Sequence, residues 1–328
     1  MLQTPTPTST AGVTVRSVVL VAGSANLDFV VRARHIPAPG ETVLGRDFET
    51  FPGGKGANQA VACARAGGAN THMLLGLGDD AYAATLEQSL RSAGVVLHIV
   101  RAQDQPTGTA FICVSDDAEN AITVAPGANQ ALRPDHWPAL ADSTHLLLQL
   151  ETPLDTVMAY ARAARAEGSK VILNAAPAQA LPIELIDLLD VLIVNQGELA
   201  VLAGEQGSIA QQLQRLPVPC VIVTLGAHGC MAFSDGVPRF QTAFAVTPVD
   251  TTGAGDTFCG AFTAALSQQS ALGDALRLAS AAAALACTKM GAQASIPERC
   301  EVDAFLAQQP PGDGSRQSAL RALCGFSD

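Results

Sequence analysis

The segment TTGAGDTFCG at 251–260 places one carboxylate directly behind a Gly-Ala-Gly turn and ahead of an apolar run. Apolar residues recur at helical spacing after Asp256, which predicts that the aspartate lies in the first turn of a buried helix. Free amides and the helix dipole make such a helix start an anion site. A carboxylate fits there as the base that deprotonates a hydroxyl attacking phosphorus. An ordinary helix cap explains these residues equally well, so both interpretations stay open.

A second Gly-rich segment, FPGGKGANQAVA at 51–62, surrounds one lysine with three glycines. Glycines let the backbone approach a ligand closely, Lys55 offers a positive charge, and Asn58 offers an amide. Gly56 stands where a Walker A loop requires Ser or Thr, so the segment is not a loop of that class. A strand-to-helix turn is the simpler interpretation, but the isolated lysine between glycines favours a binding role.

Three further turns follow apolar runs. In NQGE, Asn195 and Glu198 lie three residues apart, which fits a helix capping box and also a polar pair that holds the waters around Mg²⁺. TLGAHG at 224–229 leaves room for a flat ring or for phosphates. GLGDDA at 76–81 matches a dinucleotide fingerprint. Its two aspartates stand where a pyrophosphate would lie, so we expect a structural turn with an aspartate as helix cap.

Composition narrows the class of protein. The chain has 328 residues, of which 48% are apolar and 15% charged, and its net charge is −11. Such a chain can bury the core of one large domain. Its net negative charge does not favour binding to nucleic acid or to anionic lipid. No apolar run is long enough to span a bilayer. The eight cysteines are scattered without CxxC pairs, which favours free thiols in a reducing compartment, and we expect a cytoplasmic protein.

Short apolar runs alternate with helical patterns through most of the chain. The apolar runs, expected to be strands, lie at 17–23, 71–76, 145–151, 170–177, 190–196 and 219–226. The helical patterns lie at 55–67, 80–94 and 154–168. This alternation predicts an α/β fold, a doubly wound and mostly parallel sheet flanked by helices on both faces.

Two internal regions and both ends depart from this pattern. Residues 26–52 and 107–126 carry β-forming residues and turns without a helix, so we expect antiparallel strands that together form a small β lid. Residues 1–15 lack the basic start and apolar core of a signal peptide and are expected to be a disordered leader. Residues 308–328 are expected to be a loose tail. One domain then spans 16–307.

Five segments in this order resemble the ribokinase family of sugar kinases (PfkB-type). They are GSANLD, PGGKGANQA, LNAAPA with NQGE, TLGAHG, and VDTTGAGDTF, and the resemblance covers nearly all of residues 17–307. GGKGANQA, the early Asn-x-Asp and KMGAQASIP are most similar to members that act on ribose. The resemblance implies a doubly wound α/β domain whose β lid also forms a homodimer. It also implies transfer of the ATP γ-phosphate to a primary hydroxyl of a pentose, D-ribose above all, to give D-ribose 5-phosphate.

The resemblance also assigns roles to residues. Asp256 is the base, and the amides of Gly253, Ala254 and Gly255 form the anion hole. Sugar-binding positions are matched by Asn26, Asp28, Gly54, Lys55, Gly56, Asn58, Glu151 and Asp256. Nucleotide-binding positions are matched by Asn195, Thr224, Gly226, Gly229, Gly255 and Ser280, and Glu198 matches the Mg²⁺-associated acid. A site for a monovalent cation such as K⁺ is matched by Asp250, Thr252, Ala286, Lys289, Gly291 and Ser295, mostly through backbone carbonyls.

The chain departs from the family pattern at two positions. Ser280 stands where members often carry a histidine near the nucleotide base, which puts a stacking contact in doubt but not the reaction. Gly197 stands where a larger polar residue is common.

Three alternatives to a ribose kinase stay open. A kinase of the same family could act on another sugar or on a nucleoside, although the polar set of sugar-binding residues suits a bare polyol better than a base. A non-catalytic sugar or nucleotide sensor could use the same fold, but it has no need of a base such as Asp256. A nicotinamide dehydrogenase, suggested by GLGDDA alone, is a distant third.

Overall fold

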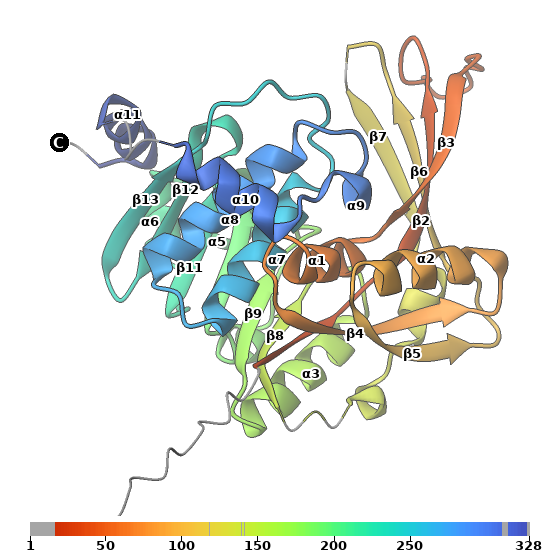
Figure 1. The fold of residues 1–328 in the computed structure, drawn as a ribbon, viewed down its shortest axis with the longest axis horizontal. Coiled ribbons are helices and arrows are strands. Elements are labelled where there is room, and N and C mark those ends of the chain that lie inside the picture. The colour runs from red at the N-terminus through yellow and green to blue at the C-terminus, as the bar shows by residue number, and fades with distance from the viewer. Residues whose placement is uncertain (1–16, 118, 139, 141, 310–313, 327–328) are drawn as a thin grey trace, which may run out of the picture.

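The computed structural model describes residues 17–117, 119–138, 140, 142–309 and 314–326. In this part of the chain, a nine-stranded sheet carries helices on both faces, and a four-stranded sheet stands apart from it (Figure 1). None of the helices among these residues has the length and apolar character that crossing a bilayer requires.

The elements have the following bounds. The large sheet contains β1 (Val18–Ala22), β4 (Asn70–Gly78), β5 (Val96–Ala102), β8 (Ser143–Leu148), β9 (Lys170–Asn174), β10 (Val191–Asn195), β11 (Cys220–Thr224), β12 (Gly229–Ser234) and β13 (Val237–Thr242). The small sheet, called the lid below, contains β2 (Asn26–Arg32), β3 (Arg46–Gly53), β6 (Gly108–Val114) and β7 (Asn120–Ala125). The α-helices are α1 (Lys55–Ala64), α2 (Ala81–Ser92), α3 (Leu154–Ala166), α4 (Ile183–Ile186), α5 (Gln196–Ala203), α6 (Ile209–Gln214), α7 (Ala254–Ser267), α8 (Leu272–Ala286), α9 (Ala292–Ser295), α10 (Arg299–Ala307) and α11 (Gly314–Cys324). Short 3-10 helices are η1 (Gly127–Ala131), η2 (Pro134–His136) and η3 (Gly226–His228).

The large sheet is mostly parallel. Its strand order is β13-β12-β11-β10-β9-β8-β1-β4-β5. Every neighbouring pair from β11 to β5 is parallel, whereas β12 and β13 pair antiparallel at one edge. The predicted α/β fold is therefore confirmed. The antiparallel edge is an addition that the apolar runs alone did not indicate.

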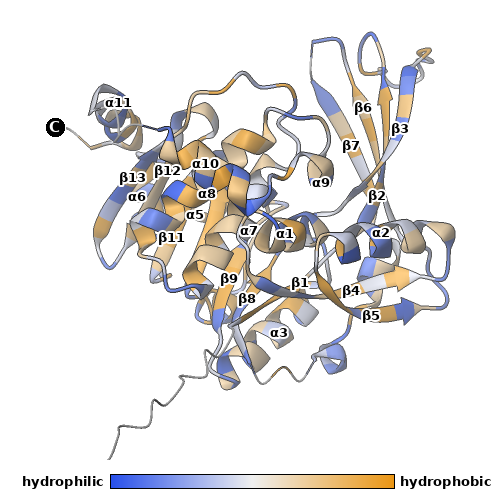
Figure 2. Ribbon diagram, viewed as in Figure 1, coloured by the Kyte–Doolittle hydropathy of each residue, from blue (hydrophilic) through white to orange (hydrophobic). Residues whose placement is uncertain are grey.

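Alternate residues of the central strands enter opposite cores. On β1, Val19 and Val21 pack into the core under α1, α2, α7 and α8, while Leu20 and Ala22 pack into the core under α3, α5 and α6. Both faces of the sheet are thus shielded from water, which explains why the strands read as continuous apolar runs. Figure 2 shows these strands as orange ribbons between the helix layers.

The lid combines antiparallel and parallel pairing. β2 pairs antiparallel with β3, and β6 pairs antiparallel with β7, as the sequence predicts. The two hairpins join through a parallel β2–β6 pair, which the sequence analysis did not anticipate. Along β2, Asn26 and Asp28 are buried, whereas Phe29 stacks on Phe111 at 5.4 Å between ring centroids. Because side chains of a strand alternate, Asn26 and Asp28 lie on one face of β2, and Phe29 lies on the other.

The C-terminal segment differs from its prediction. The sequence predicts a loose tail over 308–328, but the structure forms helix α11, with Leu320 and Cys324 buried against the core. Phe326 packs its ring edge against Phe240 of β13 at 5.4 Å. These apolar side chains order the segment because they cover β13. The predicted leader over 1–15 lies outside the described residues and stays a prediction.

Helices α1 and α7 lie side by side (Figure 1), and they approach each other closely at Gly260. A Cβ added to Gly260 would lie 2.4 Å from the carbonyl oxygen of Gln59 and 2.6 Å from the Cβ of Ala62. The Cys63 thiol also contacts the carbonyl oxygen of Gly260 at 3.2 Å. The two helix backbones can approach this closely only because residue 260 has no side chain.

We therefore expect Gly260→Ala to force α1 away from α7. Overpacking of this kind costs about 1–3 kcal/mol, and the displacement would also separate residues on the two helices. Gly273→Ala in α8 is the matched control, since an added Cβ there meets nothing within 4 Å. It should leave stability unchanged or raise it by about 0.5–1 kcal/mol. Urea unfolding measures both effects, and equal stability of the two variants would contradict the close-packing argument.

Candidate active site

Polar side chains gather where the parallel strands end. Gln149 follows β8, Asn174 ends β9, Asn195 ends β10, and Thr224 ends β11. Ligands of open α/β sheets bind at this carboxyl edge, near the point where the strand order reverses. Here the reversal lies at β1, whose neighbours are β4 on one side and β8 on the other.

Asp256 lies in the first turn of α7 and is only 9% exposed. Its Oδ2 accepts a hydrogen bond from Asn58 Nδ2, and its Oδ1 accepts one from Gln59 Nε2, both at 2.9 Å. The N-cap of α7 is Gly253, in a left-handed conformation with a φ of 74°. The carboxylate is thus held by side chains of α1 and does not serve as the N-cap residue.

A chain of amides fixes the partner of Asp256. Gln149 Nε2 donates to Gln59 Oε1 at 2.7 Å, and Gln59 Nε2 donates to Asn174 Oδ1 at 3.0 Å as well as to the carboxylate. Asn174 Nδ2 in turn donates to the carbonyl oxygen of Ile193 at 3.2 Å. The orientation of Asp256 therefore depends on groups at the ends of β8 and β9, and Gln59 acts as a positioning residue.

The charges of the site are strongly coupled. Burial, aided by the nearby carboxylates of Glu151 and Asp256, raises the pKa of Asp28 to about 7, although Lys55 opposes the shift. Asp256 in turn raises the pKa of Lys55 and overcomes the opposing effect of burial on that ammonium. Lys55 is therefore held as a cation among acids. Several carboxylates and one ammonium share a buried space, which suits the recognition of several hydroxyl groups.

The other sugar-site candidates lie around the same space. Glu151 Oε2 accepts hydrogen bonds from Ser24 Oγ and from the backbone N–H of Lys55, the latter at 3.1 Å. Asn26 Oδ1 accepts one from Asn129 Nδ2 at 2.7 Å. The Asn26–Asn129 contact joins the start of β2 to η1, and the Glu151 contacts join the residues next to β2 and β3 to the loop after β8.

The glycines before and after Lys55 allow the backbones to meet. Gly54 has a φ of 89°, and an added Cβ would lie 2.7 Å from the backbone nitrogen of Asn26. A Cβ on Gly56 would lie 2.6 Å from the backbone nitrogen of Ser24. Neither position can accept a side chain without moving the loop after β1.

A cavity of about 640 Å³ lies beside the N-terminus of α7. Its lining comes from the β11–β12 turn, the segment after β13, the start of α7, α8 and α11. The predicted nucleotide residues among the lining are Thr224, Gly226, Gly229, Gly255 and Ser280. Ala254 also lines the cavity, and Asn195 is the register partner of Thr224 at the same sheet edge. The structure thus brings these sequence candidates together.

Asn195 and Glu198 form a reciprocal capping box. Glu198 Oε2 accepts from the backbone N–H of Asn195 at 2.7 Å, and Asn195 Oδ1 accepts from the backbone N–H of Glu198 at 2.8 Å. Burial raises the pKa of Glu198, while this hydrogen bond and Lys55 oppose the shift. The described residues hold no cluster of three or more His, Cys, Asp or Glu suited to a metal ion. The Asn195 amide and the Glu198 carboxylate therefore fit an ion that keeps most of its waters, as Mg²⁺ does.

The six cation-site candidates lie in two segments, 250–252 and 286–295, that Asp250 ties together. Its Oδ1 accepts from the backbone N–H of Thr252, and its Oδ2 accepts from that of Gly291, both at 2.9 Å. Burial opposes ionisation, but these hydrogen bonds outweigh it and lower the pKa of Asp250. Lys289 Nζ pairs with Glu301 at 3.0 Å, so its ammonium points to α10. Ala286 and Ser295 are fully buried beside them.

Five site residues were not predicted from the sequence: Gln59, Gln149, Asn129, Asn174 and Ser24. Gln59 stands inside the quoted GANQA segment, but a sequence gives no sign that its side chain turns toward Asp256. Gln149 precedes Glu151 by two residues, so strand alternation could have placed both on one side of the chain. Asn129 carries no recognisable signal. The Asp80 side chain caps α2 by accepting from the Ala83 N–H at 2.9 Å, which confirms the structural interpretation of GLGDDA.

Comparisons with known proteins agree with this geometry. The model of the pfkB family of carbohydrate kinases matches residues 16–299. The chain belongs to that family. It is 40% identical over 304 residues to the ribokinase of Haemophilus influenzae, covering 89% of this chain and 99% of that relative. The resemblance found in the sequence is therefore confirmed.

Solved structures are similar over the same span. A crystal structure of ribokinase from Thermotoga maritima has a TM-score of 0.83 and 36% identity, covering 89% of this chain and 99% of that one. The structure of Arabidopsis thaliana ribokinase complexed with ribose and ATP has a TM-score of 0.79 and 34% identity, covering 90% of this chain and 99% of that one. The large sheet, its helices and the separate lid are thus a ribokinase-like fold.

The raised pKa of Asp28 predicts a pH-dependent stability. Between its ordinary value of 3.8 and about 7, the folded chain keeps a proton that the unfolded chain has released. The free energy of unfolding should therefore fall as pH rises through this window. Asp28→Asn cannot ionise, so it should lose less stability, by a difference on the order of a few kcal/mol between pH 5 and pH 8.

Urea unfolding at the two pH values measures this difference without ligand. The exposed Asp104→Asn serves as the control and should follow the unsubstituted chain. Parallel pH profiles for Asp28→Asn and the unsubstituted chain would contradict a protonated Asp28.

Proposed function

We propose that this chain is an ATP-dependent sugar kinase that phosphorylates a primary hydroxyl of D-ribose to give D-ribose 5-phosphate. The observation that carries the proposal is the position of the Gly253–Ala254–Gly255 turn. The buried polar groups around Asp256 lie beside it, and so does the cavity of about 640 Å³ that Ala254 and Gly255 line. A phosphoryl group moving from one space to the other would pass the N-terminus of α7.

The polar side suits a polyol. Asn58 Oδ1 is buried and has no hydrogen-bond partner among the described residues. A buried acceptor left unpaired costs about 1–3 kcal/mol, and a sugar hydroxyl could donate to it. The neighbouring carboxylates of Asp28 and Glu151 add acceptors for further hydroxyls. Asp256 then accepts the proton of the attacking hydroxyl, because Asn58 and Gln59 hold its carboxylate oxygens at the N-terminus of α7.

The N-terminus of α7 suits the transferred group. Its first amides have no intrahelical acceptor, although that of Ala254 donates to the carbonyl oxygen of Thr251 at 3.2 Å, and the helix dipole adds positive potential there. An α-carbon without a side chain at Gly255 leaves this end open, since an added Cβ there meets nothing within 4 Å. Lys55, a cation facing Asp256, offsets the negative charge that gathers as the phosphoryl group arrives.

Two cations complete the proposal. Mg²⁺, when bound with ATP, neutralises phosphate charge, and Glu198 and Asn195 would hold its waters from the end of β10. K⁺ would lie between the segments at 250–252 and 286–295, where Asp250 supplies negative charge and holds both backbones in place. A filled site there would fix the shape of the turn that leads into α7.

The proposed base can be tested by a single substitution. Asp256→Asn keeps the shape of the side chain but cannot take a proton, so kcat should fall by about 10²–10⁴-fold while ATP still binds. Asp274→Asn is the matched control, because Asp274 is the exposed acid in the first turn of α8. Near-normal turnover of Asp256→Asn would remove Asp256 from the base role.

The substrate and the cations are tested in the same assay. ADP release should be fastest with ribose, compared with deoxyribose, fructose and adenosine, and should rise when K⁺ replaces a bulky organic cation. Preference for fructose or adenosine would favour another kinase of the family. Thermal stabilisation by ribose and ATP without ADP release would favour a sensor. No nicotinamide cofactor should bind.

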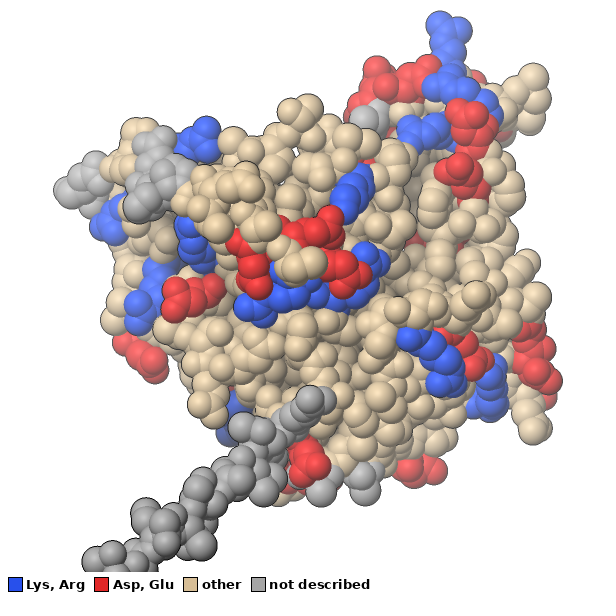
Figure 3. Space-filling model, in the orientation of Figure 1, with Lys and Arg blue, Asp and Glu red and all other residues tan. Residues whose placement is uncertain are grey.

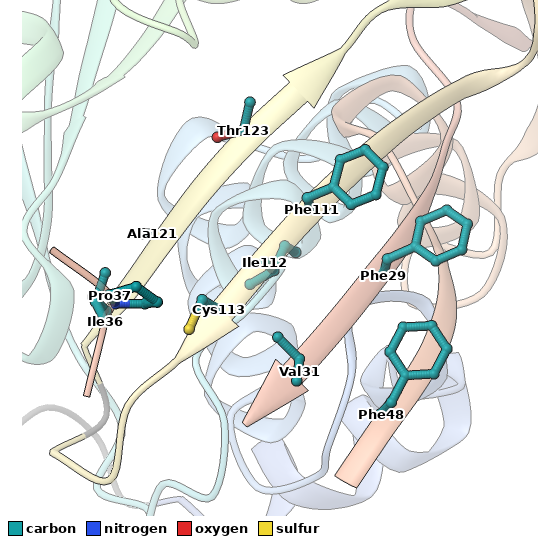
Figure 4. A pocket seen from close by; sticks show the side chains of 10 residues that line it. All are labelled: Phe29, Val31, Ile36, Pro37, Phe48, Phe111, Ile112, Cys113, Ala121 and Thr123. Carbon is teal, nitrogen blue, oxygen red and sulfur yellow. The ribbon is translucent and has the colours of Figure 1, made fainter. Parts of the chain in front are cut away.

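We also propose that the chain forms a homodimer through the lid. The outer face of the lid holds a shallow pocket of about 590 Å³, lined largely by apolar residues. Figure 4 shows Phe29, Phe48 and Phe111 side by side on neighbouring strands. Phe48 is 63% exposed and Phe111 is 54% exposed, which is costly on a monomer. On the face drawn in Figure 3, Lys and Arg lie next to Asp and Glu instead of forming a basic patch.

Phe111→Asp should convert the dimer to a monomer, because it buries a charge in an apolar interface. Leu44→Asp is the control, since Leu44 is 93% exposed in the connection between β2 and β3 but does not line the pocket. Sedimentation analysis distinguishes the two. A monomer before any substitution, or a dimer that survives Phe111→Asp, would refute this interface.

The eight free cysteines further support a reducing compartment such as the cytoplasm.

A further inference from the structure

Helix α11 lies beyond the part of the chain that matches the family. The family match ends at residue 299, whereas α11 spans Gly314–Cys324. Two of its side chains are nevertheless buried. Leu320 is 2% exposed and Cys324 is fully buried. The guanidinium of Arg321 lies 5.1 Å from the centre of the Phe240 ring on β13.

The same helix lines the large cavity beside the α7 N-terminus. Arg316, Ala319 and Leu320 are among the cavity's lining residues, opposite small residues of α8 that include Ser280 and Ala284. Positions 316, 319 and 320 share one face of a helix, since they are three and four residues apart. One face of α11 is therefore turned to this cavity, while Arg321 and Phe326 contact β13.

Arg316 also changes the charge of the cavity. Within the described residues, it is the one Lys or Arg that lines this space. The chain as a whole carries a net charge of −11, and ATP is itself strongly anionic. An anionic ligand entering this cavity would therefore meet its lining cation on α11.

We propose that α11 is an added wall of the nucleotide cavity and that Arg316 contributes to the affinity for ATP. This inference rests on the proposed function, since it takes the cavity to be the nucleotide site. Small side chains on α8 leave space in the cavity, and α11 closes that space from outside with Ala319 and Leu320. Affinity for ATP then depends on a segment outside the family match.

A matched pair of arginines on α11 tests the charge. Binding of a non-hydrolysable ATP analogue, measured by calorimetry, should weaken about two- to five-fold in Arg316→Gln, the effect of losing an exposed ion pair. The difference should shrink at high salt. Arg321→Gln removes a charge from the same helix but away from the cavity, so it should leave the dissociation constant unchanged. Equal effects of the two substitutions, or none, would overturn the role of Arg316.

A matched pair of alanines tests the wall. Ala319→Glu places a carboxylate in the cavity and should weaken binding of the analogue about ten-fold or more, because that charge must be desolvated beside an anion. Ala322→Glu adds the same charge on an exposed part of α11 that does not line the cavity, and binding should be retained. Equal binding by these two variants would overturn the wall.

The binding readout separates this inference from the proposed function. If the unsubstituted chain binds the ATP analogue but produces no ADP with any sugar, the proposed function fails while the α11 comparison still stands. Ribose phosphorylation that proceeds with the same KM for ATP in Arg316→Gln, Ala319→Glu and the unsubstituted chain would leave the function intact and refute the role of α11.

Discussion

The close crossing of α1 and α7 is the contact on which the site depends. α1 carries Lys55, Asn58 and Gln59, and α7 carries Asp256, so the distance between the helices sets the distance between base and positioning groups. That distance is short because Gly260 presents no side chain to the backbone of α1. Both helices belong to one buried core with β1, which makes the crossing rigid.

The site places several acidic groups close together, which is unfavourable for the free energy of folding. Asp28, Glu151 and Asp256 lie near one another with Lys55 as the ammonium among them. Burial of such groups is unfavourable unless each finds partners. Hydrogen bonds from Asn58, Gln59 and Ser24 supply some of these partners. A ligand that brings hydroxyl donors would supply further partners.

Much of this arrangement could be predicted from the sequence. Apolar runs and helical patterns give the parallel sheet because each strand is buried on both faces. Gly-rich turns at 53–56 and 253–255 identify two special backbone positions: an added Cβ at Gly54 or Gly56 would collide with the loop after β1, and Gly253 has a positive φ of 74°. The Gln149–Gln59 relay could not be predicted, since it joins side chains 90 residues apart whose directions depend on tertiary packing. Helix α11 was missed because prolines and glycines precede it and its apolar residues are few.

Both faces of strand β2 make specific contacts. Asn26 and Asp28 point to the polar space around Asp256, and Phe29 packs with other aromatic rings on the opposite face. A one-residue insertion within β2 would exchange the two sets and place aromatic rings toward the carboxylates. The connection from 33 to 45 between β2 and β3 is free of this constraint. Over evolutionary time, changes in length should therefore collect in that connection, while β2 itself keeps its number of residues.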